Sequence, residues 1–469
     1  MSKAYEIAAN TLPSSRQLEW QKTEFYGLIH FGMCNFLNRE WSDGKTKAEN
    51  FIPEAFSAEE WVQLCKSAGM KGVILNCKPH DGFCLWNTAC TDYSVMNADN
   101  WDTDERDIVK LLSEQCRRYG LKFGISVSPL DRHEPLFGSG DEYNEHFKKL
   151  LAELLTNYGD IFCVRLDGSN EPSKDGKIQK YDWYGYYDVI RKLQPNAVIS
   201  LCGPDVRWYG NEWGVCRKNE WSVVPKRFGI DEAIKNAEKP ENKKAKDKME
   251  LDLGGRKFIK NDTEFIWYPA EVSVSIRESW YYHKSDDYSV KTKDKLLKLY
   301  YESVGANAAL MLGISPDKDG KFPDIDTQIL RSFGYDLEKM FSYEVSYDAK
   351  YSASSEYSPE YSVENLRSTG DDKTWRPADN DKHPEIIIEL PEKDMFDKVV
   401  LMENIKNGQH VEEFELFVDE GNGKFKRYDK SGVVGYKHIC KLRPMDVKRV
   451  KIVFKEFRGK LDMSSIIMY

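Results

Sequence analysis

The fold is indicated most directly by residues 161–168, which read Ile-Phe-Cys-Val-Arg-Leu-Asp-Gly. An apolar run of this length between turn signals is typical of a buried strand, and this one ends in a carboxylate and a glycine. In a barrel of alternating strands and helices, residues at the carboxyl ends of the strands line the active face. Asp167 is therefore a candidate functional residue, while an Asp followed by Gly is equally typical of an ordinary turn.

Similar short apolar runs recur on both sides of this stretch, separated by amphipathic segments. This alternation is typical of βα units around a parallel sheet. The eight expected strands are residues 26–31, 72–77, 123–128, 161–166, 197–202, 221–224, 265–272 and 308–312. Eight such units predict an α/β fold, a (β/α)8-like TIM barrel over residues 1–340.

The expected helices between these strands are marked by their ends. Ser57-Ala58-Glu59-Glu60 is a capping box, and the helix that it begins ends at Gly69. Two further helices are expected from Asp104 to Gly120 and from Asp141 to Gly159. Each of the three ends in a glycine just before an expected strand, as the loops of a repeated βα fold require.

The composition changes after about residue 340. Ser, Tyr and Asp dominate residues 342–362, and alternating strands are expected at 385–390, 398–402, 413–418 and 448–454. Turn signals such as Gly421-Asn422-Gly423 separate them, which is typical of an antiparallel sandwich. Residues 341–469 are therefore expected to form an all-β sandwich of jelly-roll type. Within the barrel half, the Lys- and Glu-rich segment 233–249 is expected to be a solvated loop.

The composition narrows the classes of function. Lys and Arg number 68 against 77 Asp and Glu, a net charge of -9, and this balance supplies no concentrated basic face for a phosphate backbone. We therefore expect no nucleic-acid partner. Aromatic residues make up 13% of the chain, which suits stacking on sugar rings and equally suits a large packed core.

Cysteine spacing and apolar runs bear on the location of the protein. The ten cysteines include no CxxC pair, which favours reduced thiols. Residues 1–16 lack the apolar stretch of a signal peptide, and no run of about 20 apolar residues occurs. We expect no membrane partner and a cytoplasmic location. A chain whose export signal had been removed would read the same way, which leaves a periplasmic or secreted location open. The sequence carries no signal of oligomeric state.

Polar residues at the carboxyl ends of the expected strands form the candidate site, namely His30, His80, Asp81, Asp167, Glu212 and Glu271. A pair of carboxylates would serve a glycosidase, in which one attacks the anomeric carbon and the other donates a proton to the leaving oxygen. Asp167 is the first candidate of such a pair. Glu212 and Glu271 compete for the second role.

Other chemistries lack their motifs in this chain. The eight histidines show neither HxH nor HExxH spacing, and no GxGxxG or GxxxxGKS/T sequence is present to cradle a nucleotide phosphate. No GxSxG nucleophile elbow occurs. The sequence therefore predicts no cofactor and no metal, and an aromatic-lined pocket for a small-molecule or glycan substrate.

Several segments resemble those of one known family. They are residues 24–33 (EFYGLIHFGM), 38–44 (NREWSDG), 80–86 (HDGFCLW), 203–212 (GPDVRWYGNE) and 268–277 (YPAEVSVSIR). In this order they resemble the α-L-fucosidases of glycoside hydrolase family 29, particularly the branch that cleaves α-1,3/1,4-linked fucose. Residues 365–375 and 403–409 resemble the discoidin-like (coagulation factor 5/8 C-type) β-sandwich often attached to such barrels.

The resemblance implies a retaining exo-glycosidase that hydrolyses terminal α-L-fucosyl linkages of oligosaccharides or glycoconjugates by double displacement. By matching position, Asp167 is the nucleophile, and Glu212 is the general acid/base if the α-1,3/1,4 branch applies. Glu271 is the alternative acid/base, since other branches take this residue from later in the chain. The resemblance also implies a set of substrate-binding residues: His30, Glu40, Trp41, His80, Glu271 and Trp280.

Three positions differ from the usual pattern of the family. Pro79 stands where a histidine usually precedes His80, Arg165 where a tryptophan is usual, and Ser126 where a tyrosine is usual. Arg165 either lowers the pKa of Asp167 or contacts an anionic or additional hydroxyl group of a different substrate. Two alternatives stay open: a glycosidase for a different terminal sugar, and a catalytically inactive carbohydrate-binding protein on the same fold.

Overall fold

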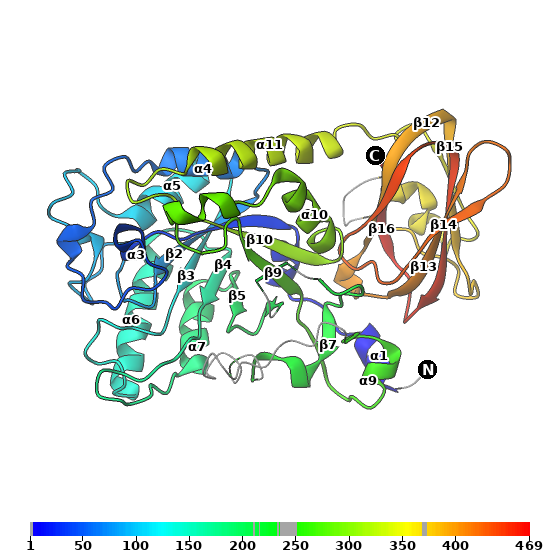
Figure 1. The fold of residues 1–469 in the computed structure, drawn as a ribbon. Helices are drawn as coiled ribbons and strands as arrows, with labels where there is room; N and C mark the ends of the chain where they lie inside the picture. The colour runs from blue at the N-terminus through cyan, green and yellow to red at the C-terminus, as the bar shows by residue number, and fades with distance from the viewer. Residues whose placement is uncertain (1–2, 210–211, 215, 232–233, 235–250, 368–372) are drawn as a thin grey trace.

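An eight-stranded parallel sheet forms the centre of the larger, N-terminal part of the computed structural model (Figure 1). The structure describes the chain except residues 1–2, 210–211, 215, 232–233, 235–250 and 368–372, so the expected loop 233–249 lies outside the described residues apart from position 234. In spatial order the strands are β5 (Val198–Leu201), β4 (Cys163–Leu166), β3 (Lys122–Val127), β2 (Gly72–Lys78), β1 (Phe25–Ile29), β10 (Ala308–Ile314), β9 (Ala270–Ser275) and β6 (Arg207–Trp208). A parallel bridge between Ser200 and Val206 joins the two ends of the sheet. The sheet is thus a nearly closed barrel, and the predicted fold class is confirmed.

Helices pack around the barrel, and their ends explain why they form where they do. The longer ones are α4 (Ala58–Ser67), α5 (Ile108–Tyr119), α6 (Asp141–Asn157), α7 (Trp183–Leu193), α10 (Lys293–Ser303) and α11 (Asp324–Met340), and the shorter ones are α1 (Lys3–Ala9), α2 (Ser15–Gln21), α3 (Met33–Leu37) and α9 (Arg256–Ile259). The Ser57 side chain accepts a hydrogen bond from the backbone N–H of Glu60, as the capping box predicts. The second expected helix begins four residues late because its N-cap is Asp107, whose carboxylate accepts from the N–H of Lys110 at 2.8 Å.

One expected barrel strand is wrong. Residues 221–224 contribute to β7 (Val223–Pro225), which pairs antiparallel with β8 (Phe265–Trp267) outside the barrel. The sixth barrel strand is instead β6, which is two residues long and pairs with β9. It consists of an arginine and a tryptophan and so gives no apolar run in the sequence. The expected strand 265–272 is in fact two, β8 and β9, which are separated at Tyr268 and Pro269.

The shorter C-terminal part of the chain is an antiparallel all-β domain with a hydrophobic core of its own. Its strands are β11 (Lys350–Ala353), β12 (Glu385–Glu403), β15 (His438–Phe457), β13 (Val411–Asp419) and β14 (Lys426–Ser431), while β16 (Met463–Met468) pairs with β12. The expected strands 385–390 and 398–402 are parts of the single strand β12. Register shifts between Glu389 and Asp394, and between Phe396 and Lys398, explain why the alternation breaks there.

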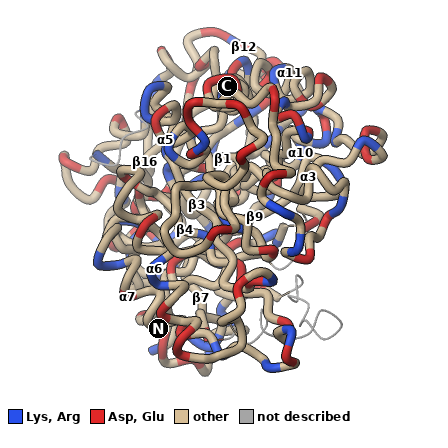
Figure 2. The backbone as a smooth tube through the Cα atoms, turned by 90° about the vertical axis from the view of Figure 1, so that its left-hand side faces the viewer, with Lys and Arg blue, Asp and Glu red and all other residues tan. Residues whose placement is uncertain are grey.

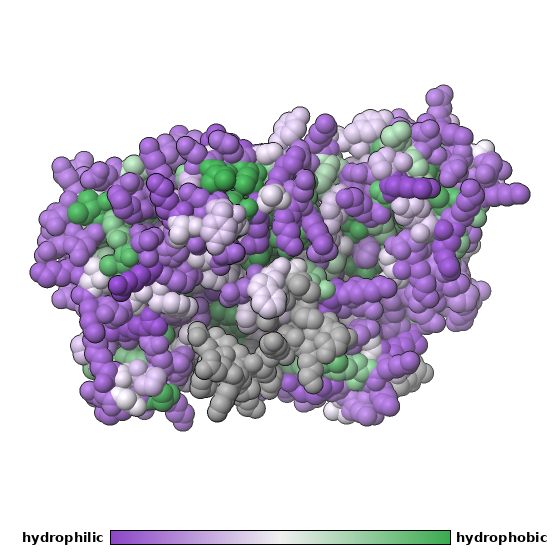
Figure 3. Space-filling view, viewed as in Figure 1, coloured by the Kyte–Doolittle hydropathy of each residue, from purple (hydrophilic) through white to green (hydrophobic). Residues whose placement is uncertain are grey.

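Positively and negatively charged residues are mixed along the chain on the side shown in Figure 2. Figure 2 shows Lys and Arg interspersed with Asp and Glu on the side that it presents. The face in Figure 3 is largely hydrophilic, with apolar groups confined to separate patches.

Among the described residues, no helix is both long enough and apolar enough to cross a bilayer. All ten cysteines are free thiols.

Gly334 is expected to be essential for the packing of α11 against α4. A Cβ atom at this position would lie 1.9 Å from the carbonyl oxygen of Ser67. We expect Gly334→Ala to lower the free energy of unfolding by about 1–3 kcal/mol, because backbone atoms must move to admit the methyl group. Urea unfolding measures this change. Ser332→Ala, at an exposed position of the same helix, is the control and should stay within about 0.5 kcal/mol of the wild type. Equal stability of Gly334→Ala and the wild type would contradict the close contact.

Candidate active site

A cavity of about 1170 Å³ opens at the carboxyl ends of the barrel strands. Parallel pairing sends these ends to one rim, so residues far apart in the sequence meet there. The cavity wall includes His30 after β1, His80 after β2, Ser126 from β3, Arg165 and Asp167 from β4 and its end, Cys202 after β5, Trp208 and Glu212 from β6 and beyond, and Trp280 after β9. A volume of this size is at the upper end of those found for small-molecule sites.

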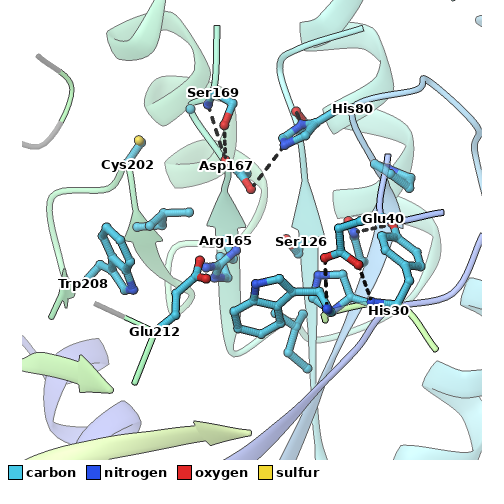
Figure 4. Close-up of a pocket in the computed structure, with 18 of the residues that line it drawn as sticks. His30, Glu40, His80, Ser126, Arg165, Asp167, Ser169, Cys202, Trp208 and Glu212 are labelled. Carbon is cyan, nitrogen blue, oxygen red and sulfur yellow. Dashed lines mark hydrogen bonds and ion pairs between the residues drawn. The ribbon is translucent and has the colours of Figure 1, made fainter. Parts of the chain in front are cut away.

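Asp167 directly follows β4 and lines the cavity. Its Oδ1 accepts hydrogen bonds from the backbone N–H and the hydroxyl of Ser169, at 3.3 and 3.2 Å. Its Oδ2 lies 3.7 Å from Nε2 of His80 (Figure 4). The residue therefore makes the local turn that its Asp-Gly sequence predicts, and its side chain, 36% exposed, still presents an oxygen on the cavity side.

His80 is fixed by two neighbours. Its Nδ1 is 2.5 Å from the hydroxyl of Ser128, and the ring of Trp41 stacks on it with centroids 5.3 Å apart and planes within 6°. Burial lowers the pKa of His80, although the charge of Asp167 acts in the opposite direction. When the Ser128 hydroxyl donates to Nδ1, the neutral ring carries its proton on Nε2, which faces Asp167.

Glu40 connects two parts of the rim. Its carboxylate accepts from the backbone N–H groups of Trp280 and Tyr281, at 2.9 and 3.3 Å, and lies 3.4 Å from Nε2 of His283. These bonds hold the loop after β9, whose Trp280 ring lies 5.1 Å from that of His30. Glu40 thus lines the cavity and also orients an aromatic wall of it.

Arg165 forms part of the inner wall of the cavity. It precedes Asp167 by two residues on β4, and side chains two apart on a strand point to the same face. The side chain is nine-tenths buried, and Nε has no hydrogen-bond partner among the described residues. The same atom lies 3.9 Å from Oε1 of Glu271.

Glu271 does not lie on the cavity wall, in contrast to its expected role as a substrate-binding residue or alternative acid/base. It is the second residue of β9, so its side chain is inside the barrel below the rim and is fully buried. Its Oε2 accepts from the hydroxyl of Tyr26 at 2.6 Å. Burial raises the pKa of Glu271, while Arg165 and Tyr26 act to lower it.

Glu212 lies beyond β6, is exposed and lines the cavity. In Figure 4 its carboxyl group and that of Asp167 are both directed into the cavity, from different strand ends. Of the two candidates for the second carboxylate, the structure therefore brings Glu212, and not Glu271, to the same cavity as Asp167.

Arg132 and Trp208 are among the lining residues that were not singled out from the sequence. Arg132, beyond β3, binds both carboxylate oxygens of Glu171, at 2.6 and 3.0 Å, and lies 5.6 Å from the ring of Trp41. Trp208 is in β6 and its buried Nε1 has no partner among the described residues. The position of Arg132 after a strand was an available signal, whereas β6 itself was not recognised. Within the described ranges, no group of three His, Cys, Asp or Glu side chains is arranged to hold a metal ion.

The half-buried ring of His30 is expected to make stability depend on pH. Burial, with the nearby charge of Arg165, lowers the pKa of His30 from 6.5 to about 3, although Asp167 acts to raise it. Between these two pH values the unfolded chain binds a proton that the folded chain does not, so stability should fall as the pH drops from about 6.5 towards 3. Urea unfolding at pH 7 and pH 5 should show a smaller loss for His30→Gln than for the wild type. An equal loss in both proteins would show that His30 is not the responsible group.

Comparisons with known proteins agree with this architecture. Residues 7–340 match the family described as alpha-L-fucosidase, and residues 350–467 match the F5/8 type C domain. Alpha-L-fucosidase 1 of Arabidopsis thaliana is 34% identical over 464 residues, which cover 98% of this chain and 87% of that protein. Human plasma alpha-L-fucosidase is 31% identical over 332 residues, 67% of this chain and 60% of that protein.

A solved structure gives the same result in three dimensions. The complex of a Ruminococcus gnavus GH29 fucosidase with fucose has a TM-score of 0.84 to this structure, at 26% identity, and covers 98% of this chain and 95% of that one. The match therefore extends over both the barrel and the C-terminal domain. With its barrel, its cavity and the match over residues 7–340, the chain belongs to the α-L-fucosidase family and is a glycoside hydrolase.

Proposed function

We propose that Asp167 and Glu212 carry out the retaining hydrolysis of terminal α-L-fucosyl linkages that the protein performs as a member of its family. The observation that carries the proposal is that these two carboxylates, from different strand ends, line one cavity. Paired carboxylates are what double displacement at an acetal requires. On the basis of the Gly-Asn-Glu run at residues 210–212, we further propose α-1,3- and α-1,4-linked fucose as the substrates.

In the first step, an oxygen of Asp167 attacks the anomeric carbon while the bond to the leaving oxygen breaks. Glu212 gives its proton to that oxygen, and an oxocarbenium-like transition state leads to a glycosyl-enzyme. In the second step, Glu212 takes a proton from water, whose oxygen displaces Asp167 and releases the sugar with retained configuration. The hydrogen bonds from Ser169 to Oδ1 of Asp167 support this assignment, because they hold the carboxylate in place at the end of β4.

The remaining candidates suit the binding of the terminal sugar. His30 and His80 present ring nitrogens that can bind hydroxyl groups, and Glu40 presents a carboxylate at the rim. Trp280 offers a flat apolar face for the C6 methyl of fucose, and the exposed Trp41 offers one nearer the entrance. We assign these five residues to substrate binding.

A different terminal sugar is the second candidate, and Arg165 favours it. A guanidinium in the cavity wall suits a sugar with an additional or charged oxygen substituent, because it can donate several hydrogen bonds. Fucose offers only hydroxyl groups to such a donor. A substrate panel separates the two candidates.

Nitrophenyl glycosides of several sugars are the test of the terminal sugar and of Asp167. We expect the α-L-fucoside to be hydrolysed fastest, and we expect Asp167→Ala to lose turnover because no nucleophile remains. Its thermal unfolding should stay close to that of the wild type, since the side chain is partly exposed. A clear preference for another sugar would favour the second candidate, and substantial activity of Asp167→Ala would disprove the nucleophile.

Glu212→Gln should make the rate depend strongly on the leaving group. We expect a loss of about 10²–10⁴-fold with fucosylated oligosaccharides, which need a proton from the acid. With a dinitrophenyl α-L-fucoside, formation of the glycosyl-enzyme should change little, because that leaving group needs no proton. Initial rates and pre-steady-state bursts give both values.

Glu278→Gln is the matched control for Glu212→Gln, since Glu278 is an exposed carboxylate on the same cavity wall. It should leave the ratio of the two rates unchanged. An equal loss with both substrates in Glu212→Gln would contradict the acid/base role. Oligosaccharides with α-1,2 and with α-1,3/1,4 fucose, compared in the wild type, test the proposed linkage.

A further inference from the structure

The C-terminal domain contacts the chain segment that carries Glu212. We propose that Gln409 of this domain is a positioning residue for the acid/base, because it fixes the base of the segment between β6 and Glu220. The inference rests on the role of Glu212 proposed above. It gives the C-terminal domain a part in catalysis that requires no sugar binding by that domain.

A buried ion pair joins the two ends of the segment that runs from β6 to Glu220. Arg207 in β6 pairs with one oxygen of the Glu220 carboxylate, and Arg217 lies 3.4 Å from the other. The backbone N–H of Arg217 also donates to the hydroxyl of Tyr209. Arg207 and Glu220 are 7% and 1% exposed, and breaking such a buried pair is costly. Glu220 therefore ties the far end of the segment that carries Glu212 to β6.

The middle of this segment has a second fixed point on the barrel side. Gly214 has a φ of +71°, and a Cβ atom there would lie 2.2 Å from Cδ2 of Leu299 in α10. This close contact with α10 lies two residues after Glu212. Glu212 thus lies between a strand of the barrel and a fixed glycine, and Glu220 closes the other end.

Gln409 holds the backbone at Glu220 from the C-terminal domain. Its Nε2 donates to the carbonyl oxygen of Glu220 at 3.2 Å, and its Oε1 accepts from the N–H of Ser222 at 2.8 Å. The same carbonyl accepts from Nδ2 of Asn307 at 2.8 Å. The Gln409 side chain is fully buried, so its removal leaves buried backbone groups without this partner.

Gln409 is itself held rigidly. It precedes His410 and Val411, whose backbone N–H groups both donate to Oε1 of Glu403 at 2.7 Å. The other oxygen of Glu403 accepts from the N–H of Gly435, also at 2.7 Å. One buried carboxyl group therefore accepts three backbone hydrogen bonds, two of which fix the turn that presents Gln409 to the barrel.

This arrangement matters for the reaction because an acid must lie within hydrogen-bond reach of the leaving oxygen. A displacement of about 1 Å can cost on the order of 10²-fold in rate. A loosened Glu220 would displace Glu212 without altering Asp167, which is fixed by Ser169 in the loop after β4. Loss of Gln409 should therefore impair proton donation and spare nucleophilic attack.

The experiment compares Gln409→Ala and Gln409→Glu with the wild-type full chain on two substrates. The substrates are a fucosylated oligosaccharide, which needs the acid, and a dinitrophenyl α-L-fucoside, which does not. We expect kcat/KM to fall about tenfold or more for the oligosaccharide and less than about twofold for the dinitrophenyl fucoside. Gln409→Glu keeps an acceptor for Ser222 but loses the donor to Glu220, so it decides the question if Gln409→Ala does not fold.

Lys437→Met is the control for a general effect of the interface. The Lys437 side chain pairs with Glu24 just before β1, and its replacement leaves the backbone hydrogen bond between Asn307 and Lys437 in place. This variant should lower the thermal stability and leave the ratio of the two rates unchanged.

Two outcomes would overturn the inference, and they differ from each other. Equal losses on both substrates in the Gln409 variants, or a change in thermal stability alone, would show that Gln409 only stabilises the interface. If Glu212→Gln itself shows no dependence on the leaving group, the proposed acid/base role fails first, and the inference fails with it.

Discussion

Parallel pairing of β1 to β5, β9 and β10 is the constraint on which the site depends. It brings the carboxyl ends of the strands to one rim and leaves their opposite ends buried in the barrel. The same geometry separates two carboxylates that look equivalent in the sequence. Asp167 follows the end of β4 and reaches the cavity, whereas Glu271 lies near the start of β9 and is fully buried. Position along a strand therefore decides which acid can meet a substrate.

Much of this site could be predicted from sequence because strand ends are local signals. His30, His80 and Asp167 each lie within three residues of the end of an expected strand, and all three line the cavity. The features that were missed have no such signal. β6 is only two residues long and is stabilised by pairing with β9, so its recognition needs the tertiary structure. Arg165 in β4 lies 3.9 Å from Glu271 in β9. The sequence of neither strand could predict this contact, because the two strands are far apart in the chain.

Orientation of the aromatic walls depends on polar groups that are themselves part of the cavity. Glu40 accepts from the backbone at Trp280, and Ser128 binds the ring of His80, on which Trp41 stacks. Because the Glu40 carboxylate already accepts hydrogen bonds from backbone N–H groups, it has less freedom to move when a sugar binds. Such preorganisation lets binding energy go into recognition of the substrate, because little is lost in ordering the protein. The residues proposed to bind sugar thus also shape the site before the sugar arrives.

The C-terminal domain also helps to hold a residue of the site in place before the substrate binds. A barrel gives rigid support at strand ends, but the acid/base candidate lies past β6, the shortest strand of the sheet. Support for that segment has to come from other contacts, and these are the Arg207–Glu220 ion pair and the amide of Gln409. The latter comes from a domain that has a hydrophobic core of its own and that also packs against the barrel core through Val400 and Ile439. The short strand β6 gives little support to the segment that follows it, and the contact from Gln409 supplies additional support from outside the barrel. This contact gives a physical reason for the two domains to occur in one chain.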